Sequence, residues 1–144
     1  MRILVSACLL GVCCRYDGDS KPCRQVMDLA KDHELIPVCP EQLGGLPTPR
    51  PPAEIRDCRV INSLGQDVTA QYEKGAVETL RLYDLLHCGC ALLKARSPSC
   101  GSEMVYDGTF SGTLVPGQGI AAKLLSQHHI TVLSEENDWG SLLD

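Results

Sequence analysis

Three of the nine cysteines each follow a short apolar run, and this shared placement is the most informative chemical pattern in the chain. Cys8 and Cys39 end their runs directly, and Cys100 follows its run after a Ser-Pro-Ser turn. Short runs rich in branched residues and bounded by turn formers predict buried parallel strands. The carboxyl ends of parallel strands meet at one edge of the sheet, where ligands bind. Three thiols gathered there would form a soft-metal site, suited to an iron–sulfur cluster with one iron left open.

The same cysteines have a second interpretation, as structural thiols, because buried cysteines are common in sheet cores. Their wide spacing matches neither a zinc ribbon nor a compact ferredoxin run. Each nevertheless lies between a strand and a loop, where backbone amides can point at cluster sulfides. Both interpretations stay open from the residues alone. Cys13 and Cys14 are neighbours that could hardly both ligate one cluster, so Cys13 is expected to aid substrate binding or to pack.

Two polar residues lie beside these cysteines in the sequence. Glu41 comes two residues after Cys39, and Ser99 directly precedes Cys100. Glu41 is either a solvated loop carboxylate or an acid–base group that acts on a bound heterocycle and a water. Ser99 either stabilises its turn or donates a hydrogen bond to a ring oxygen or to the cysteine sulfur.

Basic side chains also fall within a few residues of the expected site, namely Arg15, Arg50, Lys94 and Arg96. In a chain of net charge −5, basic groups on site loops indicate attraction of a small anion such as phosphate. The alternative for each of them is an ordinary surface salt bridge. The sequence Gly-Gln-Gly at 117–119 could bind phosphate through its amides, although it lacks the third glycine of a dinucleotide fingerprint.

Hydrophobic periodicity predicts the elements that must position these residues. Strands are expected at 2–6, 34–38, 90–93 and 130–133, with helices over 22–33, from 67 or 69 to 87, and from about 117 to 127. This order predicts an α/β fold, a three-layer Rossmann-like domain with a mostly parallel sheet and long functional loops at the strand C-terminal edge. A single domain over residues 1–144 is expected.

Three further segments carry local predictions. The proline-rich segment 40–56 is expected to be a rigid, irregular and functional loop. Hairpins are expected over 59–68, around Leu64-Gly65, and around Asp107-Gly108. The helix that ends at 87 is expected to bury an apolar face formed by Ala76, Val77, Leu80 and Tyr83.

The composition favours a small protein of the cytoplasm. With 144 residues, 44% of them hydrophobic, the chain can bury one core. An odd number of cysteines fits poorly with the disulfide framework of a secreted protein, so reduced thiols are expected. The acidic charge argues against a stable nucleic-acid partner. No stretch approaches the roughly 20 apolar residues of a membrane span, so no membrane association is expected.

Long sequence motifs extend over nearly the whole chain and resemble one bacterial family, the thiouracil and 4-thiouridylate desulfidases. The motifs that carry the resemblance are residues 5–11, 14–18, 39–46, 49–54, 97–101, 107–112, 119 and 134–137. The resemblance implies a [4Fe-4S] cluster held by Cys8, Cys39 and Cys100, with a fourth iron that acts as Lewis acid and sulfur acceptor. It implies a non-redox hydrolysis of a thiolated pyrimidine, such as 4-thio-UMP or thiouracil, by water, with release of sulfide. Glu41 matches the proton-transferring carboxylate of the family and Ser99 its hydroxyl partner.

Two other functions compete with this expectation. In the first, a non-catalytic zinc or iron–sulfur protein, Cys13 or Cys14 would close the coordination shell, because a structural site is saturated with ligands. In the second, the chain would be a module that binds thiolated RNA. The acidic charge and the scarcity of aromatic side chains weigh against this module.

Overall fold

The computed structural model describes residues 1–139 and 143. At its centre is a four-stranded parallel sheet in the order β2-β1-β5-β8. The strands are β1 (Arg2–Ser6), β2 (Glu34–Val38), β5 (Cys90–Leu93) and β8 (Val132–Ser134). The three strands expected at 2–6, 34–38 and 90–93 are confirmed, and the last strand begins two residues later than expected.

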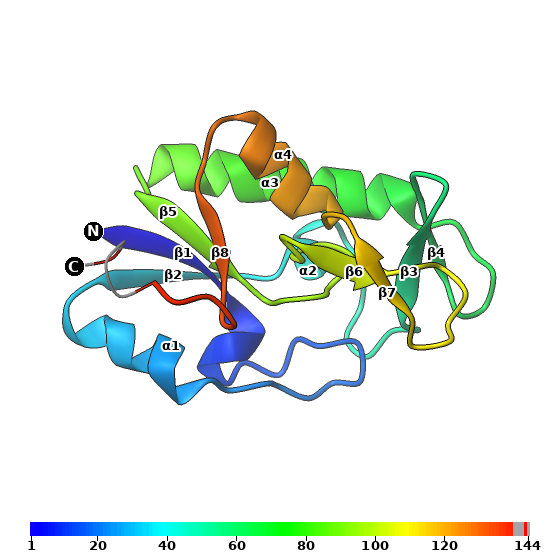
Figure 1. Cartoon of the computed structure of the whole chain (residues 1–144), viewed down its shortest axis with the longest axis horizontal. Coiled ribbons are helices and arrows are strands. Elements are labelled where there is room, and N and C mark those ends of the chain that lie inside the picture. The colour runs from blue at the N-terminus through cyan, green and yellow to red at the C-terminus, as the bar shows by residue number, and fades with distance from the viewer. Residues whose placement is uncertain (140–142, 144) are drawn as a thin grey trace.

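Helices cover both faces of the sheet, with α3 and α4 above it and α1 below it in Figure 1. The helices are α1 (Arg24–Asp28), α2 (Pro40–Leu43), α3 (Thr69–Leu85) and α4 (Ile120–Gln127), with 3-10 turns η1 (Ala7–Leu10) and η2 (Leu29–Lys31). Successive residues of β1 serve opposite layers, since Ile3 and Val5 pack with Val26 of α1 while Leu4 packs with Leu125 of α4. The predicted three-layer α/β fold is confirmed.

The expected irregular loop over 40–56 is wrong in part, because this segment contains helix α2 and a strand. The hairpin expected over 59–68 is confirmed only as an isolated antiparallel bridge between Ile61 and Asp67, with the Asn62 amide donating to the Gln66 carbonyl at 2.9 Å. Strand β4 (Arg59–Asn62) also pairs antiparallel with β3 (Ala53–Arg56), in a hairpin that was not expected. Asp57 and Cys58 form its turn with φ angles of 50° and 63°, the conformation usually supplied by Asn-Gly. Because Asp-Cys is not a usual sequence for such a turn, the sequence did not predict it. The other expected hairpin is confirmed as β6 (Met104–Tyr106) with β7 (Leu114–Pro116).

The buried face of α3 agrees only in part with the expected apolar one, since Ala76 is buried and Leu80 and Tyr83 pack against the core, but Val77 does not. Val77 is 49% exposed, and the buried residues of the helix are Thr69, Tyr72, Gly75, Ala76 and Thr79. The reason is that α2 packs against α3 backbone to backbone. A Cβ atom on Gly75 would collide with the carbonyl oxygen of Pro40, and one on Gly44 would collide with that of Gln71. Two glycines therefore set how closely the two helices approach.

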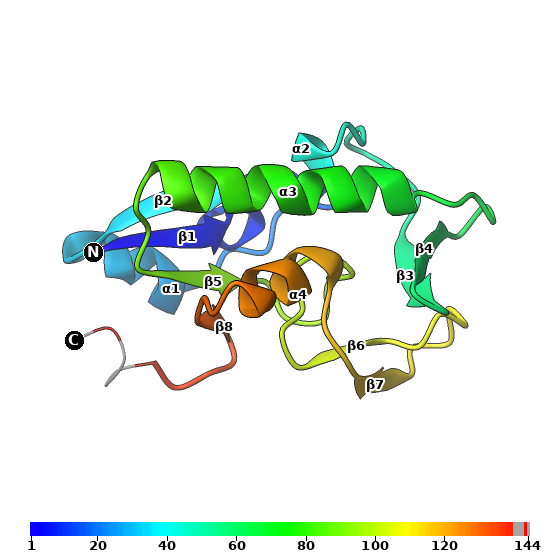
Figure 2. The same cartoon turned by 90° about the horizontal axis from the view of Figure 1, so that it is seen from above.

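In the described part of the chain, none of the helices has the length and apolar character needed to cross a membrane. The single domain over residues 1–144 stays a prediction, and residues 140–142 and 144 within it lie outside the described residues. Figure 2 shows both hairpins at one end of the molecule, opposite the N-terminus. The carboxyl ends of β1, β2 and β5 point toward that end.

Replacing Gly75 by alanine is expected to lower the free energy of unfolding by about 1–3 kcal/mol, the usual cost of overpacking. The loss should occur although alanine favours an isolated helix by about 1 kcal/mol relative to glycine. Denaturant unfolding of the cluster-free protein measures the change. Lys74→Ala, an exposed neighbour on the same helix, is the control and should stay within about 0.5 kcal/mol of the parent. Equal stability of the two variants would contradict the backbone contact.

A candidate active site lined by four cysteines

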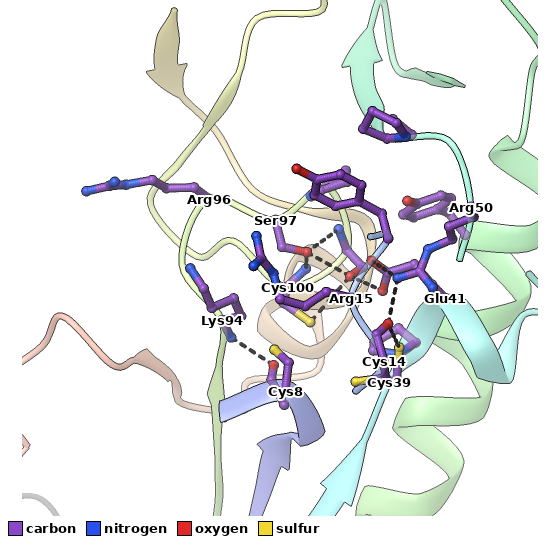
Figure 3. Close-up of a pocket in the computed structure, with 18 of the residues that line it drawn as sticks. Cys8, Cys14, Arg15, Cys39, Glu41, Arg50, Lys94, Arg96, Ser97 and Cys100 are labelled. Atoms are coloured by element: carbon purple, nitrogen blue, oxygen red, sulfur yellow. Dashed lines mark hydrogen bonds and ion pairs between the residues drawn. The ribbon is translucent and has the colours of Figure 1, made fainter. Parts of the chain in front are cut away.

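The carboxyl ends of β1, β2 and β5 open into a cavity of about 570 Å³, a volume within the range of small-molecule sites. The cysteines that line it are Cys8, Cys14, Cys39 and Cys100. Figure 3 shows these four side chains around one part of the cavity. The structure thus brings together the three cysteines expected from the sequence and adds Cys14, whereas Cys13 is exposed and lies outside the cavity lining.

The places of Cys8 and Cys39 follow directly from the strands before them. Cys8 lies in the 3-10 turn η1 immediately after β1, and Gly11 ends that turn with a φ of 93°, a conformation that favours glycine. Cys39 is the extended residue before α2, where Pro40 occupies the first helical position. β1 and β2 are paired in parallel register up to Ser6 and Val38, so Cys8 and Cys39, which follow these strands, lie at the same edge of the sheet.

Cys100 is held by a loop that helix α4 stabilises. The Ser97 hydroxyl accepts hydrogen bonds of 3.1 Å from the amides of Ser99 and Cys100. The first amides of α4 donate to this loop as well, Ile120 to the Pro98 carbonyl and Ala121 to that of Ser99, both at 2.9 Å. The amides of Gly117 and Gly119 likewise donate to the carbonyls of Glu103 and Gly101, at 2.9 and 2.7 Å, so these two amides are not available to a phosphate. The start of α4 positions Ser99 and Cys100 instead.

The surroundings of Cys14, Cys39 and Cys100 disfavour the ionised form of these thiols. Hydrogen bonding with Cys14, followed by burial, raises the pKa of Cys39 well above its ordinary range. The contact of Cys14 with Cys39 lowers the pKa of Cys14, but its contact with Cys8, burial and the charge of Glu41 outweigh this and raise it to about 11. Burial, then the charge of Glu41, raises the pKa of Cys100 to about 12. Metal binding at these residues would therefore release protons.

A buried carboxylate lies beside the thiols. Glu41, on α2, is 9% exposed, and the Ser99 hydroxyl donates to its Oε1 atom at 2.5 Å. The guanidinium of Arg50 is 3.7 Å from the other carboxylate oxygen and donates to the Cys14 carbonyl at 3.0 Å. The same Ser99 Oγ is 3.3 Å from the sulfur of Cys100. One hydroxyl thus connects the carboxylate to a thiol.

Two of the expected anion-binding residues are engaged by carboxylates. Lys94 Nζ is 3.0 Å from Glu135, and both side chains are largely buried. Arg96 forms a 2.9 Å pair with Glu136 and points away from the cysteines in Figure 3. Although both residues line the cavity, their charges are compensated.

Arg15 and Lys21 supply positive charge that is compensated less. Arg15 stacks over the ring of Tyr16 at 5.6 Å and is 3.7 Å from Asp17, a long ion pair. Lys21 lines the cavity, and no carboxylate of the described residues forms an ion pair with its ammonium group. Lys21 was missed from the sequence because it lies in a loop thirteen residues after Cys8, and no local pattern places it at the cavity.

The two hairpins, β3–β4 and β6–β7, are joined to each other by hydrogen bonds at the edge of the cavity. The carboxylate of Glu54, on β3, accepts hydrogen bonds from the amides of Gly108 and Phe110 at 3.0 and 3.1 Å. Arg56 donates to the Gly108 carbonyl at 2.6 Å. Phe110 lines the cavity with a φ of 57° and is 38% exposed. The tip of the β6–β7 hairpin is thus fixed to β3 rather than to the sheet.

Across the described residues, no three His, Cys, Asp or Glu side chains converge closely enough to hold a single metal ion. The four thiols instead surround part of a larger space. Thiols together with a buried carboxylate, a hydroxyl and basic groups can hold a sulfur-binding centre and move protons beside it.

Comparison with known proteins agrees with this arrangement. The family model described as 2-thiouracil desulfurase matches residues 3–137. The chain is 40% identical over 151 residues to the uncharacterized protein YbbK of Bacillus subtilis (strain 168), covering 98% of this chain and 99% of that protein. It is 44% identical to a solved structure, the [4Fe-4S]-dependent thiouracil desulfidase TudS, with a TM-score of 0.89, covering 99% of this chain and 94% of the other. The chain therefore belongs to the 2-thiouracil desulfurase family, as its motifs predicted.

Proposed function

We propose that this protein removes sulfur from thiolated pyrimidines such as thiouracil or 4-thio-UMP, by a hydrolysis without redox change that releases sulfide and the oxo-pyrimidine. The observation that carries the proposal is the presence, in one cavity, of cysteine thiols and the buried Glu41–Ser99 pair. Membership of the family supports desulfuration of thiouracil. All nine cysteines are free, which supports the cytoplasm as the location.

The residues of the cavity fit a [4Fe-4S] cluster, since thiolates are the usual protein ligands of such clusters. We assign Cys8, Cys39 and Cys100 as the ligands, with Cys14 beside them. A cluster of four irons accepts ligands spaced more widely than a single ion does, and the open cavity favours a site with a free coordination position over a saturated structural one. When bound, the cluster would supply a Lewis-acidic iron with affinity for the sulfur of the substrate.

Proton transfer is assigned to Glu41 and Ser99. A water admitted to the cavity would form a C–O bond to the ring carbon that carries sulfur and give one proton to a carboxylate oxygen of Glu41. Glu41 would return that proton to the adduct as the C–S bond breaks, and the second proton of the water would leave with the sulfur as the carbonyl forms, so that the products are the oxo-pyrimidine and hydrogen sulfide. The Ser99 hydroxyl, which already donates to Oε1, would hold this carboxylate in place. The guanidinium of Arg50 would balance its negative charge.

Glu41→Gln is expected to keep its cluster while sulfide release falls by a factor of about 10²–10⁴, the usual contribution of general acid–base catalysis. Ser99→Ala should lose less, about 10- to 100-fold, because it removes one hydrogen bond to the carboxylate but keeps the carboxylate itself. The measurement is sulfide released per intact cluster by the anaerobically reconstituted protein, with iron counted in each variant. Glu73→Gln, on the exposed side of α3, is the matched control. Parental turnover in Glu41→Gln would remove this residue from the mechanism, and no sulfide from the parent would overturn the proposed function.

Serine at Cys8, Cys39 or Cys100 is expected to abolish cluster retention and sulfide release, because a hard hydroxyl replaces thiolate poorly as an iron ligand. The optical absorption of the cluster and iron content measure the loss. Cys58→Ser, an exposed cysteine outside the cavity, should retain both. Cys14→Ser is the most informative further variant. Loss of the cluster in Cys14→Ser with retention in one of the other three would show that Cys14 replaces that residue in the ligand set.

Binding of a nucleotide phosphate is assigned to Arg15 and Lys21, the cavity cations least compensated by carboxylates. Arg50, Lys94 and Arg96 also lie around the thiols, but their charges face Glu41, Glu135 and Glu136. A phosphate attracts positive charge that is free of a local partner more strongly than charge already paired.

Lys21→Ala is expected to lower kcat/KM for 4-thio-UMP by about 10- to 150-fold, the range expected for one hydrogen bond to a charged group. It should leave kcat/KM for 4-thiouracil unchanged, since the free base has no phosphate. Lys123→Ala, an exposed lysine of α4 outside the cavity lining, serves as the control. An equal loss on the base and the nucleotide would contradict a phosphate contact.

A further inference from the structure

Tyr72 presents a polar group to the cavity that no described residue uses. Its side chain is 3% exposed and lines the cavity together with Glu41, Arg50 and Ser99. Every fully enclosed side-chain nitrogen or oxygen of the described residues has a hydrogen-bond partner, whereas no described residue bonds to the Tyr72 hydroxyl. The hydroxyl must therefore touch the open space of the cavity.

The position of Tyr72 is fixed by the start of α3. The Thr69 amide donates to Asp67 Oδ1 at 2.9 Å, and the buried Thr69 hydroxyl accepts from the Val60 amide at 2.8 Å. The close packing of α2 at Gly75 then sets the distance between Tyr72 and Glu41. A ring held in this way loses little further freedom when a ligand binds, so its hydroxyl is preorganised.

The hydroxyl is a donor at every working pH. Burial, followed by the charge of Glu41, raises the pKa of Tyr72 well above its ordinary range. Negative charge on Cys39 or Cys100 acts in the same direction. A neutral phenol beside a carboxylate and thiols can donate its hydrogen bond to an acceptor, and because no described residue accepts it, a ligand bound in the cavity can do so in place of water.

Packing alone would be served as well by phenylalanine, without the cost of an unpaired polar group in a buried place. The other tyrosines of the lining differ in this respect, since Tyr16 is 41% exposed and Tyr106 is partly exposed, so water can reach both. Tyr72 is the tyrosine of this cavity whose hydroxyl a bound ligand would remove from water.

We propose that the Tyr72 hydroxyl donates a hydrogen bond to the ring oxygen of the thiolated pyrimidine, the carbonyl that sulfur has not replaced, and so is a specificity-determining residue. The inference rests on the function proposed above and adds a requirement on the substrate. A pyrimidine with a thiocarbonyl and no ring carbonyl would lack the acceptor. The site would then bind pyrimidines that carry this carbonyl oxygen in preference to those that lack it, since a site built to hydrogen-bond a polar group rejects the analogue without it.

The test compares Tyr72→Phe with the parent on 4-thiouracil, which has a ring oxygen, and on pyrimidine-4-thione, which lacks it. Both proteins are reconstituted anaerobically, and sulfide release is measured per intact cluster. We expect kcat/KM of Tyr72→Phe to fall about 3- to 10-fold on 4-thiouracil, the weight of one neutral hydrogen bond, and to stay within twofold on pyrimidine-4-thione. The dissociation constant for uracil, measured by calorimetry, should rise by the same factor as the loss on 4-thiouracil.

Tyr83→Phe, on the same helix but outside the cavity lining, is the matched control and should match the parent in every assay. Equal losses on both substrates, or an unchanged dissociation constant for uracil, would overturn the role of Tyr72 while the parent remains active. Absence of sulfide release from the parent would instead overturn the proposed function. Should Tyr72→Phe fold poorly, uracil protection against thermal unfolding in the parent, compared with pyrimidine, tests the same oxygen contact. Equal protection by both ligands would overturn it.

Discussion

Removing the carboxylate of Glu41 from water is the main physical constraint on this molecule. An ionised carboxylate in a buried place is costly unless charges and hydrogen-bond donors surround it. Here Arg50 and Ser99 supply them, and each connects Glu41 to a different part of the chain. Arg50 also bonds the carbonyl of Cys14, and Ser99 lies against the sulfur of Cys100. Four segments distant in sequence therefore meet around one charge, and the geometry of the thiols depends on how that charge is satisfied.

The same constraint explains why the cavity is polarised in an acidic protein. Glu41 lies among the thiols, and its charge adds to the effects of hydrogen bonding and burial that raise the pKa of Cys14, Cys39 and Cys100. Basic residues line the same cavity, and Lys94 and Arg96 are paired there with acidic residues of the segment after β8. Charge compensation of this kind keeps individual side chains in place, while Lys21 at the same cavity keeps its charge available to an anionic group.

The placement of the cysteines could be predicted because it depends on a strong local signal, an apolar strand followed at once by a thiol. Cys8 and Cys39 belong to neighbouring parallel strands, and parallel pairing alone places their ends together. The contributions of Cys14, Lys21 and Tyr72 could not be predicted, because each reaches the cavity through a tertiary contact with no local pattern. The face of α3 shows the same limit. Its packing depends on Gly75 meeting the backbone of Pro40, which a search for apolar periodicity passes over. The turn at Asp57 and Cys58 was hidden because its residues are not the usual ones for that conformation.

The hydrogen bonds that Glu54 accepts hold the two hairpins to each other and not to the parallel sheet, so the hairpins and the sheet can evolve at different rates. The hairpins β3–β4 and β6–β7 are held to each other through Gly108 and Phe110 at the edge of the cavity, whereas the thiols leave from the parallel sheet. Substitutions or changes of length at the tip near Phe110 can therefore alter which molecules fit without displacing the residues that carry the chemistry. Loops on a fixed scaffold are the usual place for such variation. Within one family, divergence in accepted substrates should be concentrated in these hairpins, and the strand ends should change least.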